Sequence, residues 1–408
     1  LMKNILLSFN QPTLNGSVRL EGSKSISNRL LIMQALSDSP ALIHHLSPGD
    51  DTQALQHILL SKDEVGDVGA AGTTMRFLTA YYACRNGKKT LTGSARMLQR
   101  PIGILVDALR SLGATIHYLG EEGYPPLEIH GKELEGGPLQ IRADVSSQYI
   151  SSLLMCAPLM KNGLQLQMEG KIGSLPYIKM TLELMRTMGI GFEMNGNTIH
   201  VFPGKYEGIE MWVEGDWSAA SYYFSMAAIF HKSALRIDGL FPESLQGDSQ
   251  LIRIYEQLGV EADFHNKHLL LSGTGKVVDT FQYDFTECPD LAQTVAVTCA
   301  ALGVPARLTG LESLRIKETD RTAALAAELM KFNVRFTQEE DTWVLQGKAE
   351  RKDGVSIRTY EDHRMAMAFA PLAILQPITI QHPEVVAKSY PSFWDDLSRL
   401  GFSSTPSS

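Results

Sequence analysis

One pattern recurs six times along this chain of 408 residues: an apolar helix, a short turn, and a β-strand that ends in a small or polar residue. The central apolar residues of the six strands are Ile43, Leu91, Met168, Ile237, Leu308 and Ile380. Most of the repeats are roughly 70 residues long, which is too long for a solenoid unit. The first repeat is the shortest, and we expect it to lack its final hairpin.

The repeat predicts an α/β fold with internal symmetry. Each unit is expected to run strand–helix–strand–helix–hairpin, because a helix with one apolar face needs a sheet to cover. Six units divide naturally into two domains of three, with a boundary near residues 212–216, ahead of an expected helix over 217–230. The serine-rich tail at 403–408 is expected to have no regular structure.

Composition describes an acidic chain of ordinary globular type. Hydrophobic residues make up 44% and charged residues 20%, and the net charge is −8. Nucleic acid and anionic membranes are therefore not expected as partners, and no apolar run approaches the roughly 18 residues that span a bilayer. The cysteines show no zinc-like spacing, which predicts reduced core residues in a cytoplasmic protein without a metal site. They are Cys84, Cys156, Cys288 and Cys299.

Six segments place cations or hydroxyl groups where an apolar helix is expected to begin. They are residues 22–29, 70–76, 100–103, 146–148, 315–321 and 362–364. Backbone N–H groups at a helix start are unpaired and the positive end of the helix dipole lies there, so such positions attract anions. Any one of them alone is more typical of an ordinary capped helix. Together, on an acidic chain, they favour a site for a small polyanion.

The segment 315–321, Arg-Ile-Lys-Glu-Thr-Asp-Arg, is the most informative of the six. Lys317 and Arg321 are four residues apart and are expected to share a helix face, with Glu318 between them. A solvated, salt-bridged turn is the alternative for this segment. Asp290 is expected to open an apolar helix over 291–302, either as an N-cap or as a general base with Glu318 as its partner acid.

In this order, and along essentially the whole chain, the motifs resemble those of the 5-enolpyruvylshikimate-3-phosphate synthase family. The matching segments are Gly22–Arg29, Ala71–Arg76, Arg96–Arg110, Ser146–Gln148, Ser174–Tyr177, Lys317–Arg321, Asp362–Met367 and Ala387–Lys388. The resemblance implies the two-domain enolpyruvyl transferase fold, with three βαβαββ repeats per domain arranged as an inside-out α/β barrel. It also implies one domain of residues 1–18 and 215–408, a second of residues 19–214, and an active site in the cleft between them.

The family transfers the enolpyruvyl group of phosphoenolpyruvate to the 5-hydroxyl group of shikimate 3-phosphate and releases phosphate by addition and elimination. The resemblance implies no metal, no organic cofactor, and a monomer. The residues expected to bind shikimate 3-phosphate are Lys24, Ser25, Arg29, Ser146, Ser147, Gln148, Ser174, Tyr177, Asp290, Ser313 and Lys317. The residues expected to bind phosphoenolpyruvate are Lys24, Gly72, Arg100, Gln148, Arg321, Arg364 and Lys388. Asp290 is expected to act as base and Glu318 as acid, with Lys24 assisting.

Three positions depart from the family pattern. Ala70 and Ser313 each stand where the family usually has Asn, so one amide contact is lost near phosphoenolpyruvate and another is reduced near shikimate 3-phosphate. Phe77 stands where many members have Pro, which could shift the helix that carries Gly72. These departures bear on the response to glyphosate, the inhibitor that occupies the family's phosphoenolpyruvate site.

Two other functions fit parts of the sequence. The sister family of UDP-N-acetylglucosamine enolpyruvyl transferases shares the architecture, but its members usually carry a reactive Cys in the loop that matches residues 94–100. Here that loop reads Ser-Ala-Arg-Met-Leu-Gln-Arg. A non-catalytic anion-binding protein of the same fold is the other alternative, suggested by Ala70 and the missing hairpin and opposed by the presence of Asp290, Glu318 and every expected cation.

Overall fold

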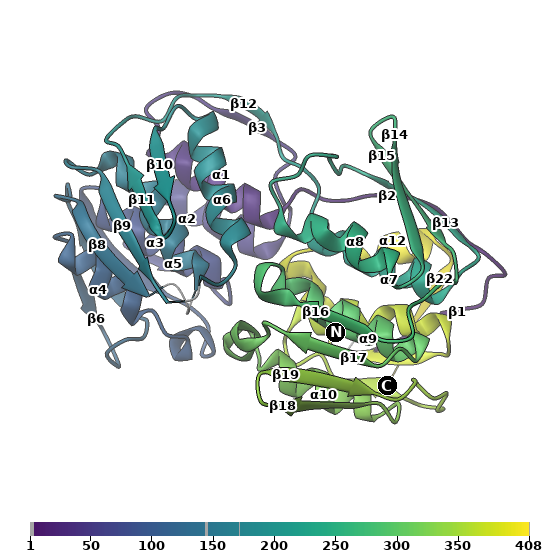
Figure 1. The fold of residues 1–408 in the computed structure, drawn as a ribbon. Coiled ribbons are helices and arrows are strands. Elements are labelled where there is room, and N and C mark those ends of the chain that lie inside the picture. The colour runs from purple at the N-terminus through teal and green to yellow at the C-terminus, as the bar shows by residue number, and fades with distance from the viewer. Residues whose placement is uncertain (1–3, 143–145, 171, 408) are drawn as a thin grey trace. The chain divides into compact units, whose positions relative to one another are not determined.

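The computed structural model describes residues 4–142, 146–170 and 172–407. The chain forms two compact units, one of residues 1–22 and 214–408 and the other of residues 23–213. Each unit contains several small sheets and a set of helices, which confirms the predicted α/β class (Figure 1). Within the described ranges, no helix has the length and apolar character needed to cross a membrane.

The described residues of the unit 23–213 form three sheets. Its helices are α1 (Lys24–Leu36), α2 (Asp50–Leu60), α3 (Gly72–Ala83), α4 (Gly103–Ser111), α5 (Ser147–Cys156) and α6 (Leu175–Thr187). Its strands are β3 (Leu42–His44), β4 (Val65–Asp67), β5 (Gly87–Thr92), β6 (Thr115–Tyr118), β7 (Leu127–Gly131), β8 (Gly137–Arg142), β9 (Leu164–Glu169), β10 (Phe192–Asn195), β11 (Thr198–Val201) and β12 (Glu210–Trp212). The sheet orders are β4-β5-β7-β6, β10-β11-β9-β8 and β12-β3.

In the unit of residues 1–22 and 214–408, the part of the chain that the structure describes also forms three sheets, and both chain segments contribute to them. Its helices are α7 (Trp217–Ile229), α8 (Leu251–Glu256), α9 (Ala292–Leu302), α10 (Arg321–Met330), α11 (His363–Phe369) and α12 (Phe393–Arg399). Its strands are β1 (Asn4–Phe9), β2 (Leu14–Arg19), β13 (Ser233–Asp238), β14 (Val260–His265), β15 (His268–Gly273), β16 (Phe281–Asp284), β17 (Ala306–Thr309), β18 (Arg335–Glu339), β19 (Thr342–Gln346), β20 (Ser356–Ile357), β21 (Ile378–Gln381) and β22 (Phe402–Ser407). The sheet orders are β14-β15-β13-β2, β16-β17-β19-β18 and β20-β21-β1-β22.

Five of the six sheets in the described chain share one pairing scheme. An outer strand runs parallel to its neighbour, and two antiparallel strands complete the sheet, as in β4 with β5, followed by β7 and β6. The sixth sheet holds only the parallel pair β12 and β3. β3 contains Ile43, the central strand residue of the first repeat, where the sequence predicts a missing hairpin, and its partner β12 comes from the end of the unit. The inside-out barrel arrangement of the repeats stays a prediction.

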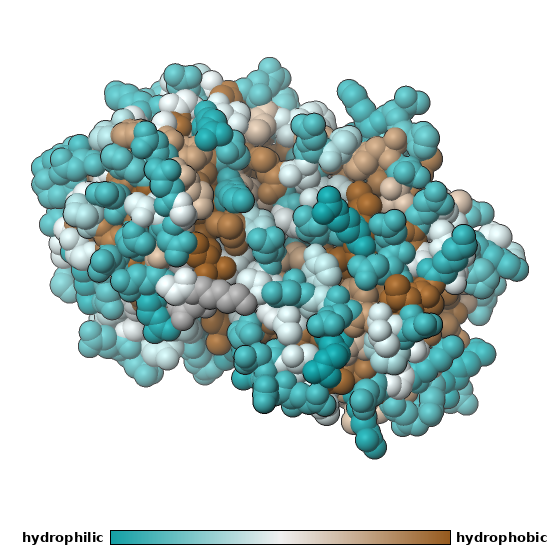
Figure 2. All heavy atoms as spheres, in the orientation of Figure 1, coloured by the Kyte–Doolittle hydropathy of each residue, from teal (hydrophilic) through white to brown (hydrophobic). Residues whose placement is uncertain are grey.

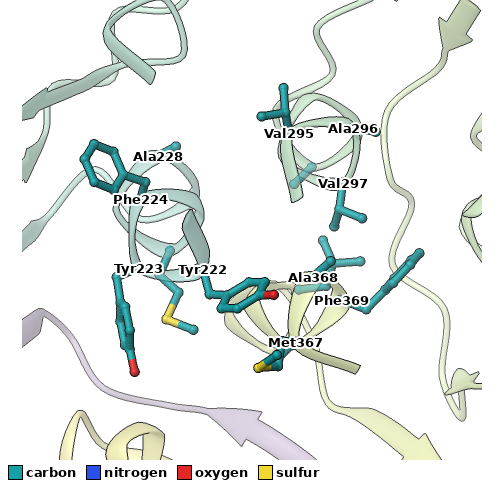
Figure 3. Packing of buried hydrophobic residues seen from close by; sticks show 14 of the residues in the cluster. Tyr222, Tyr223, Phe224, Ala228, Val295, Ala296, Val297, Met367, Ala368 and Phe369 are labelled. Carbon is teal, nitrogen blue, oxygen red and sulfur yellow. The ribbon is translucent and has the colours of Figure 1, made fainter. Parts of the chain in front are cut away.

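Each unit has its own hydrophobic core. In the unit that contains α7, that helix is buried along almost its whole length, and a helix with apolar residues on every side must be surrounded by other elements. It packs against α9, which in turn packs against α11. Figure 3 shows Tyr222 projecting from α7 towards the helix that carries Ala368, with Val297 above it. Polar side chains cover most of the face that Figure 2 presents.

Two local predictions were wrong. Helix α1 begins at Lys24 rather than at Leu30, because Ser23 serves as its N-cap and accepts a hydrogen bond from the Ile26 N–H at 3.5 Å. The tail at 403–407 is not irregular, since it forms strand β22 and pairs antiparallel with β1. Ser408 lies outside the described residues. Pro406 is tolerated in β22 because this strand lies at the edge of its sheet.

Candidate active site

Arg321 is the centre of a charged cluster in the unit of residues 214–408. It is the first residue of α10, whose N-cap is Asp320, and it is only 2% exposed. Its Nη1 donates to Asp290 Oδ1 at 2.9 Å, its Nε to Asp362 Oδ2 at 2.7 Å, and its Nη2 to Glu318 Oε2 at 2.8 Å. One planar guanidinium thus holds three carboxylates in fixed directions.

Two further cations complete this cluster. Arg364 Nη2 donates to Asp290 Oδ2 at 3.1 Å, and Lys388 Nζ donates to Glu318 Oε1 at 2.7 Å. Asp290 and Glu318 therefore each join Arg321 to a second cation. The side chains of Asp290, Glu318, Arg364 and Lys388 are 10–16% exposed, compared with 2% for Arg321. The rim of the cluster is accessible, whereas its centre is closed.

The carboxylates offset the cost of burying the charge of both arginines. Burial lowers the pKa of Arg321, but the carboxylates of Asp362, Glu318 and Asp290 outweigh burial and raise this pKa above its ordinary value. The pKa of Arg364 is raised in the same way, with Asp290 as the main opposing charge to burial. The three cations and the three carboxylates balance in formal charge.

The structure corrects the predicted helix face for Lys317 and Arg321. Lys317 follows the 3₁₀ helix η6 (Glu312–Ile316) in an extended conformation, with ψ −152°. The N-cap Asp320 accepts a hydrogen bond from the Ala323 N–H at 3.0 Å and sets the helix start at Arg321. Lys317 therefore lies outside α10, and Ser313 lies on η6. This short helix packs against η5 (Pro289–Leu291), which carries Asp290.

A second set of predicted residues lies in the unit of residues 23–213. Lys24 stands in the first turn of α1, and its Nζ contacts Asp51 Oδ2 at 2.9 Å. Asp51 lies in the first turn of α2 and its side chain is 5% exposed. The predicted phosphate-binding lysine is thus held by a carboxylate that the sequence analysis missed. Ser25 follows Lys24 in the same turn and is half-buried.

Arg29 is fixed by its own unit. It is 2% exposed, its Nε donates to Thr181 Oγ1 at 2.7 Å, and its Nη2 donates to Ser151 Oγ at 3.1 Å. Its guanidinium lies 5.4 Å from the ring centre of Phe77 and 5.7 Å from that of Tyr177. Burial lowers its pKa to about 10. Arg29 is predicted to bind a substrate phosphate, but these donors are directed to protein groups, and its guanidinium holds Tyr177 in place.

Gly72 opens α3 beside two guanidinium groups. A Cβ at this position would lie 2.5 Å from Arg100 Nη1 and 2.6 Å from Arg76 Nη1, so only glycine leaves room for both. Arg76 Nη1 also donates to the Gly72 carbonyl at 2.9 Å. Arg100 is 7% exposed. Arg76 belongs to the same guanidinium pair but was not among the predicted site residues, although it ends one of the matching segments.

The serine segment at the start of α5 lies next to α3. Ser146 is the N-cap and its Oγ accepts from the Gln148 N–H at 3.3 Å. Ser147 is the first residue of α5. The side chain of Gln148 donates to Thr73 Oγ1 at 3.0 Å, which places it one residue from Gly72. The structure thus brings the predicted residues Gly72, Arg100 and Gln148 to adjoining elements.

Ser174 and Tyr177 lie at the start of α6. Ser174 precedes the helix in a left-handed conformation, with φ 57° and ψ 43°. Tyr177 is in the first turn, and its carbonyl accepts from Thr181 Oγ1 at 2.8 Å. Among the residues that the structure describes, no three His, Cys, Asp or Glu side chains are grouped in a way that could hold a metal ion.

Three comparisons with known proteins bear on these two sets of residues. The family model described as EPSP synthase (3-phosphoshikimate 1-carboxyvinyltransferase) matches residues 55–397. A 3-phosphoshikimate 1-carboxyvinyltransferase of Bacteroides fragilis is 48% identical over 394 residues, covering 95% of this chain and 96% of the relative. One from Idiomarina loihiensis is 36% identical over 416 residues, covering 94% of this chain and 96% of the relative.

Solved structures show the same fold. An EPSP synthase from Acinetobacter baumannii superposes with a TM-score of 0.79 at 22% identity, covering 98% of this chain and 100% of that chain. The fold comparison agrees with the family model and with relatives that match almost end to end. The chain belongs to the EPSP synthase family.

Proposed function

We propose that this chain transfers the enolpyruvyl group of phosphoenolpyruvate to the 5-hydroxyl group of shikimate 3-phosphate and releases phosphate, a step of the shikimate pathway. The observation that carries the proposal is the cluster around Arg321. It holds Asp290 and Glu318, the proposed proton carriers, on one guanidinium, with Arg364 and Lys388 beside them. Membership of the EPSP synthase family indicates which reaction to expect, and this cluster contains acid, base and cationic groups that suit that reaction.

The substrates explain the number of cations. Phosphoenolpyruvate and shikimate 3-phosphate each carry a phosphate and a carboxylate, and such groups are bound by bidentate arginine and by point-charge lysine. We assign phosphoenolpyruvate to the residues Lys24, Gly72, Arg100, Gln148, Arg321, Arg364 and Lys388. We assign shikimate 3-phosphate to the residues Lys24, Ser25, Arg29, Ser146, Ser147, Gln148, Ser174, Tyr177, Asp290, Ser313 and Lys317. Arg29 serves this second group mainly by fixing Tyr177, because its donors are directed to protein acceptors.

The ion pairs of the cluster can be exchanged for substrate contacts. Arg364 and Lys388 are bound to Asp290 and Glu318 at the accessible rim. When substrate phosphate or carboxylate oxygens approach these two cations, the cations can bind them in place of the carboxylates. Asp290 and Glu318 then keep their contacts with Arg321, which hold both carboxylates in position for proton transfer.

The chemistry needs two proton carriers. In the addition, the 5-hydroxyl oxygen bonds to the central carbon of phosphoenolpyruvate, Asp290 takes the hydroxyl proton, and Glu318 protonates the methylene carbon with help from Lys24. In the elimination, Glu318 takes a proton back from the new methyl group while the bond to the phosphate oxygen breaks. The proton held by Asp290 leaves with phosphate, so Asp290 ends the cycle as a carboxylate and Glu318 as a carboxylic acid, the states in which they began it.

Substrate specificity gives the direct test. Purified protein is mixed with phosphoenolpyruvate and either shikimate 3-phosphate or UDP-N-acetylglucosamine, and both phosphate release and the enolpyruvyl product are measured. We expect turnover with shikimate 3-phosphate alone. Turnover only with the nucleotide sugar would assign the sister reaction, and tight binding of shikimate 3-phosphate without phosphate release would indicate a scaffold.

The setting of the reaction is also part of the proposal. The four cysteines are buried free thiols, which supports the reducing cytoplasm as the compartment. One chain supplies every residue assigned above, and this supports a monomer as the active form. Sedimentation of the active protein at assay concentration would test the second point, and a stable dimer would contradict it.

A further inference from the structure

Asp248 is a buried carboxyl group beside the charged cluster, and no step proposed above uses it. It lies on the 3₁₀ helix η3 (Gly247–Gln250) and is 3% exposed. Its Oδ2 accepts a hydrogen bond from the Ser218 hydroxyl group on α7. Its Oδ1 has no hydrogen-bond partner within the described part of the chain. A fully ionised carboxylate with one bare oxygen is costly at such a depth.

The neighbours of Asp248 connect it to the proposed base. Helix α7 packs against both η3 and η5, the short helix that carries Asp290. Asp290, Arg364 and Asp216 act electrostatically on Asp248, and burial, followed by the charge of Asp248, raises the pKa of the Cys288 thiol. Burial, followed by the charge of Asp290, raises the pKa of Asp248 to about 7, while Ser218 and Arg364 oppose this shift.

Asp290 needs help to act as a base. Its two oxygens contact Arg321 and Arg364 at 2.9 Å and 3.1 Å, and opposite charges at such distances favour the ionised form and weaken a carboxylate as a proton acceptor. A second negative charge near Asp290 would offset this effect. Asp248 is placed to supply that charge, since it is hydrogen-bonded to Ser218 on α7, the helix that packs against both η3 and η5, and both Asp290 and Arg364 act on it electrostatically.

We propose that Asp248 is a positioning residue for Asp290: in its ionised form it offsets the field of Arg364 and makes Asp290 a stronger acceptor of the hydroxyl proton. The proposal rests on the proposed function, because it assigns a purpose to the basicity of Asp290. The two carboxyl groups then titrate as a pair. Turnover should rise with pH as this pair loses its shared proton near neutrality.

Kinetics across pH test the proposal with three variants. Asp248→Asn keeps the size of the side chain and an acceptor for Ser218. We expect its kcat to fall about ten-fold or more while its KM values stay within about three-fold of wild type. The acid limb, the part of the pH–rate profile in which turnover rises with pH near neutrality, should disappear. Ser218→Ala removes the hydrogen bond that lowers the pKa of Asp248, so the acid limb should move to higher pH. Glu328→Gln is the matched control, because Glu328 is a buried carboxylate on α10 that contacts Lys331 and Tyr360 instead.

Two kinetic outcomes would overturn the proposal. One is a wild-type acid limb in Asp248→Asn, and the other is a loss confined to KM. If Asp248→Asn does not fold, the pH–rate profile of Ser218→Ala is the test. An acid limb at the same pH as in wild type, or at lower pH, would refute the role of Asp248.

A measurement without substrate separates this inference from the proposed function. A carboxyl group whose pKa is raised on folding stabilises the protein less above its folded pKa than below it. The Tm of Asp248→Asn relative to wild type should therefore increase between about pH 5 and pH 8. In an Asp290→Asn background this increase should be smaller, because burial still raises the pKa of Asp248 but the charge of Asp290 no longer adds to it. Equal increases in both backgrounds would show that the two groups do not interact, whether or not the enzyme turns over its substrates.

Discussion

At the scale of single residues, the guanidinium of Arg321 decides how the cluster is built. It is buried, and the three carboxylates that it contacts compensate its charge. Breaking one member of a buried ion pair typically costs about 3–5 kcal/mol, because the other charge is left uncompensated. Variants at Asp290 or Glu318 therefore change both proton transfer and the charge balance, and experiments need substitutions that separate the two effects.

Asp290→Ala should bind both substrates but lose turnover by at least about 100-fold, the usual size of an acid–base contribution. Arg321 keeps Asp362 and Glu318 as partners in this variant. Asp290→Asn is the companion variant, because it preserves the size of the side chain while removing the base. Steady-state kcat and equilibrium binding of shikimate 3-phosphate are the measurements. Turnover near the wild-type rate in either variant would exclude Asp290 as the base.

Lys388→Met should mainly raise the KM for phosphoenolpyruvate. The long apolar side chain of Met fills the same space, and Glu318 retains its contact with Arg321 at 2.8 Å. Lys331→Met is the control, because Lys331 also pairs with a carboxylate but with Glu328, outside the cluster. An effect of Lys388→Met on the KM for shikimate 3-phosphate alone would overturn the assignment of Lys388.

The partners of the predicted residues could not be found from the sequence. Asp290 lies 31 residues from Arg321 and 74 from Arg364, and Lys24 lies 27 from Asp51. Spacing rules work within one helix or one hairpin, so contacts made between separate helices leave no local pattern. The cations themselves were visible because each stands near the start of an apolar helix or in a matching segment.

At the scale of elements, helix starts depend on capping residues that compete. Gly22–Arg29 contains three serines, and the prediction put all eight residues ahead of the helix. Ser23 is the cap in the structure, which moves Lys24 into the first turn of α1. Near Arg321 the opposite error occurred, since Asp320 caps α10 and leaves Lys317 outside it. Tail strand β22 was missed because its serines and proline carry no strand signal, and its pairing with β1 comes from the other end of the chain.

Gly72→Ala should raise the KM for phosphoenolpyruvate by disturbing the start of α3. The added methyl group would lie closer than 3 Å to atoms of Arg100 and Arg76, so at least one guanidinium must move. Gly204→Ala is the control, because its Cβ would meet its nearest neighbour, Ile190 Cδ1, at an ordinary 3.5 Å. Equal KM values for Gly72→Ala and wild type would show that these arginines do not bind phosphoenolpyruvate.

At the scale of the whole molecule, the residues that the structure describes build two separate hydrophobic cores. One contains Leu329 and the other Leu153, both fully buried. The backbone passes from one unit to the other at residues 22–23 and again at 213–214. Because each core is closed within its own unit, this protein need not unfold in a single two-state transition.

We expect calorimetry of the substrate-free protein to resolve two transitions. Leu153→Ala and Leu329→Ala remove the same group from different cores, and each should cost about 2–5 kcal/mol in the free energy of unfolding of its own unit. Each variant should therefore lower the temperature of one transition, and the two variants should not lower the same one. A single transition that both variants shift equally would mean that the two cores unfold together, and the free energy of unfolding would then be a property of the whole chain.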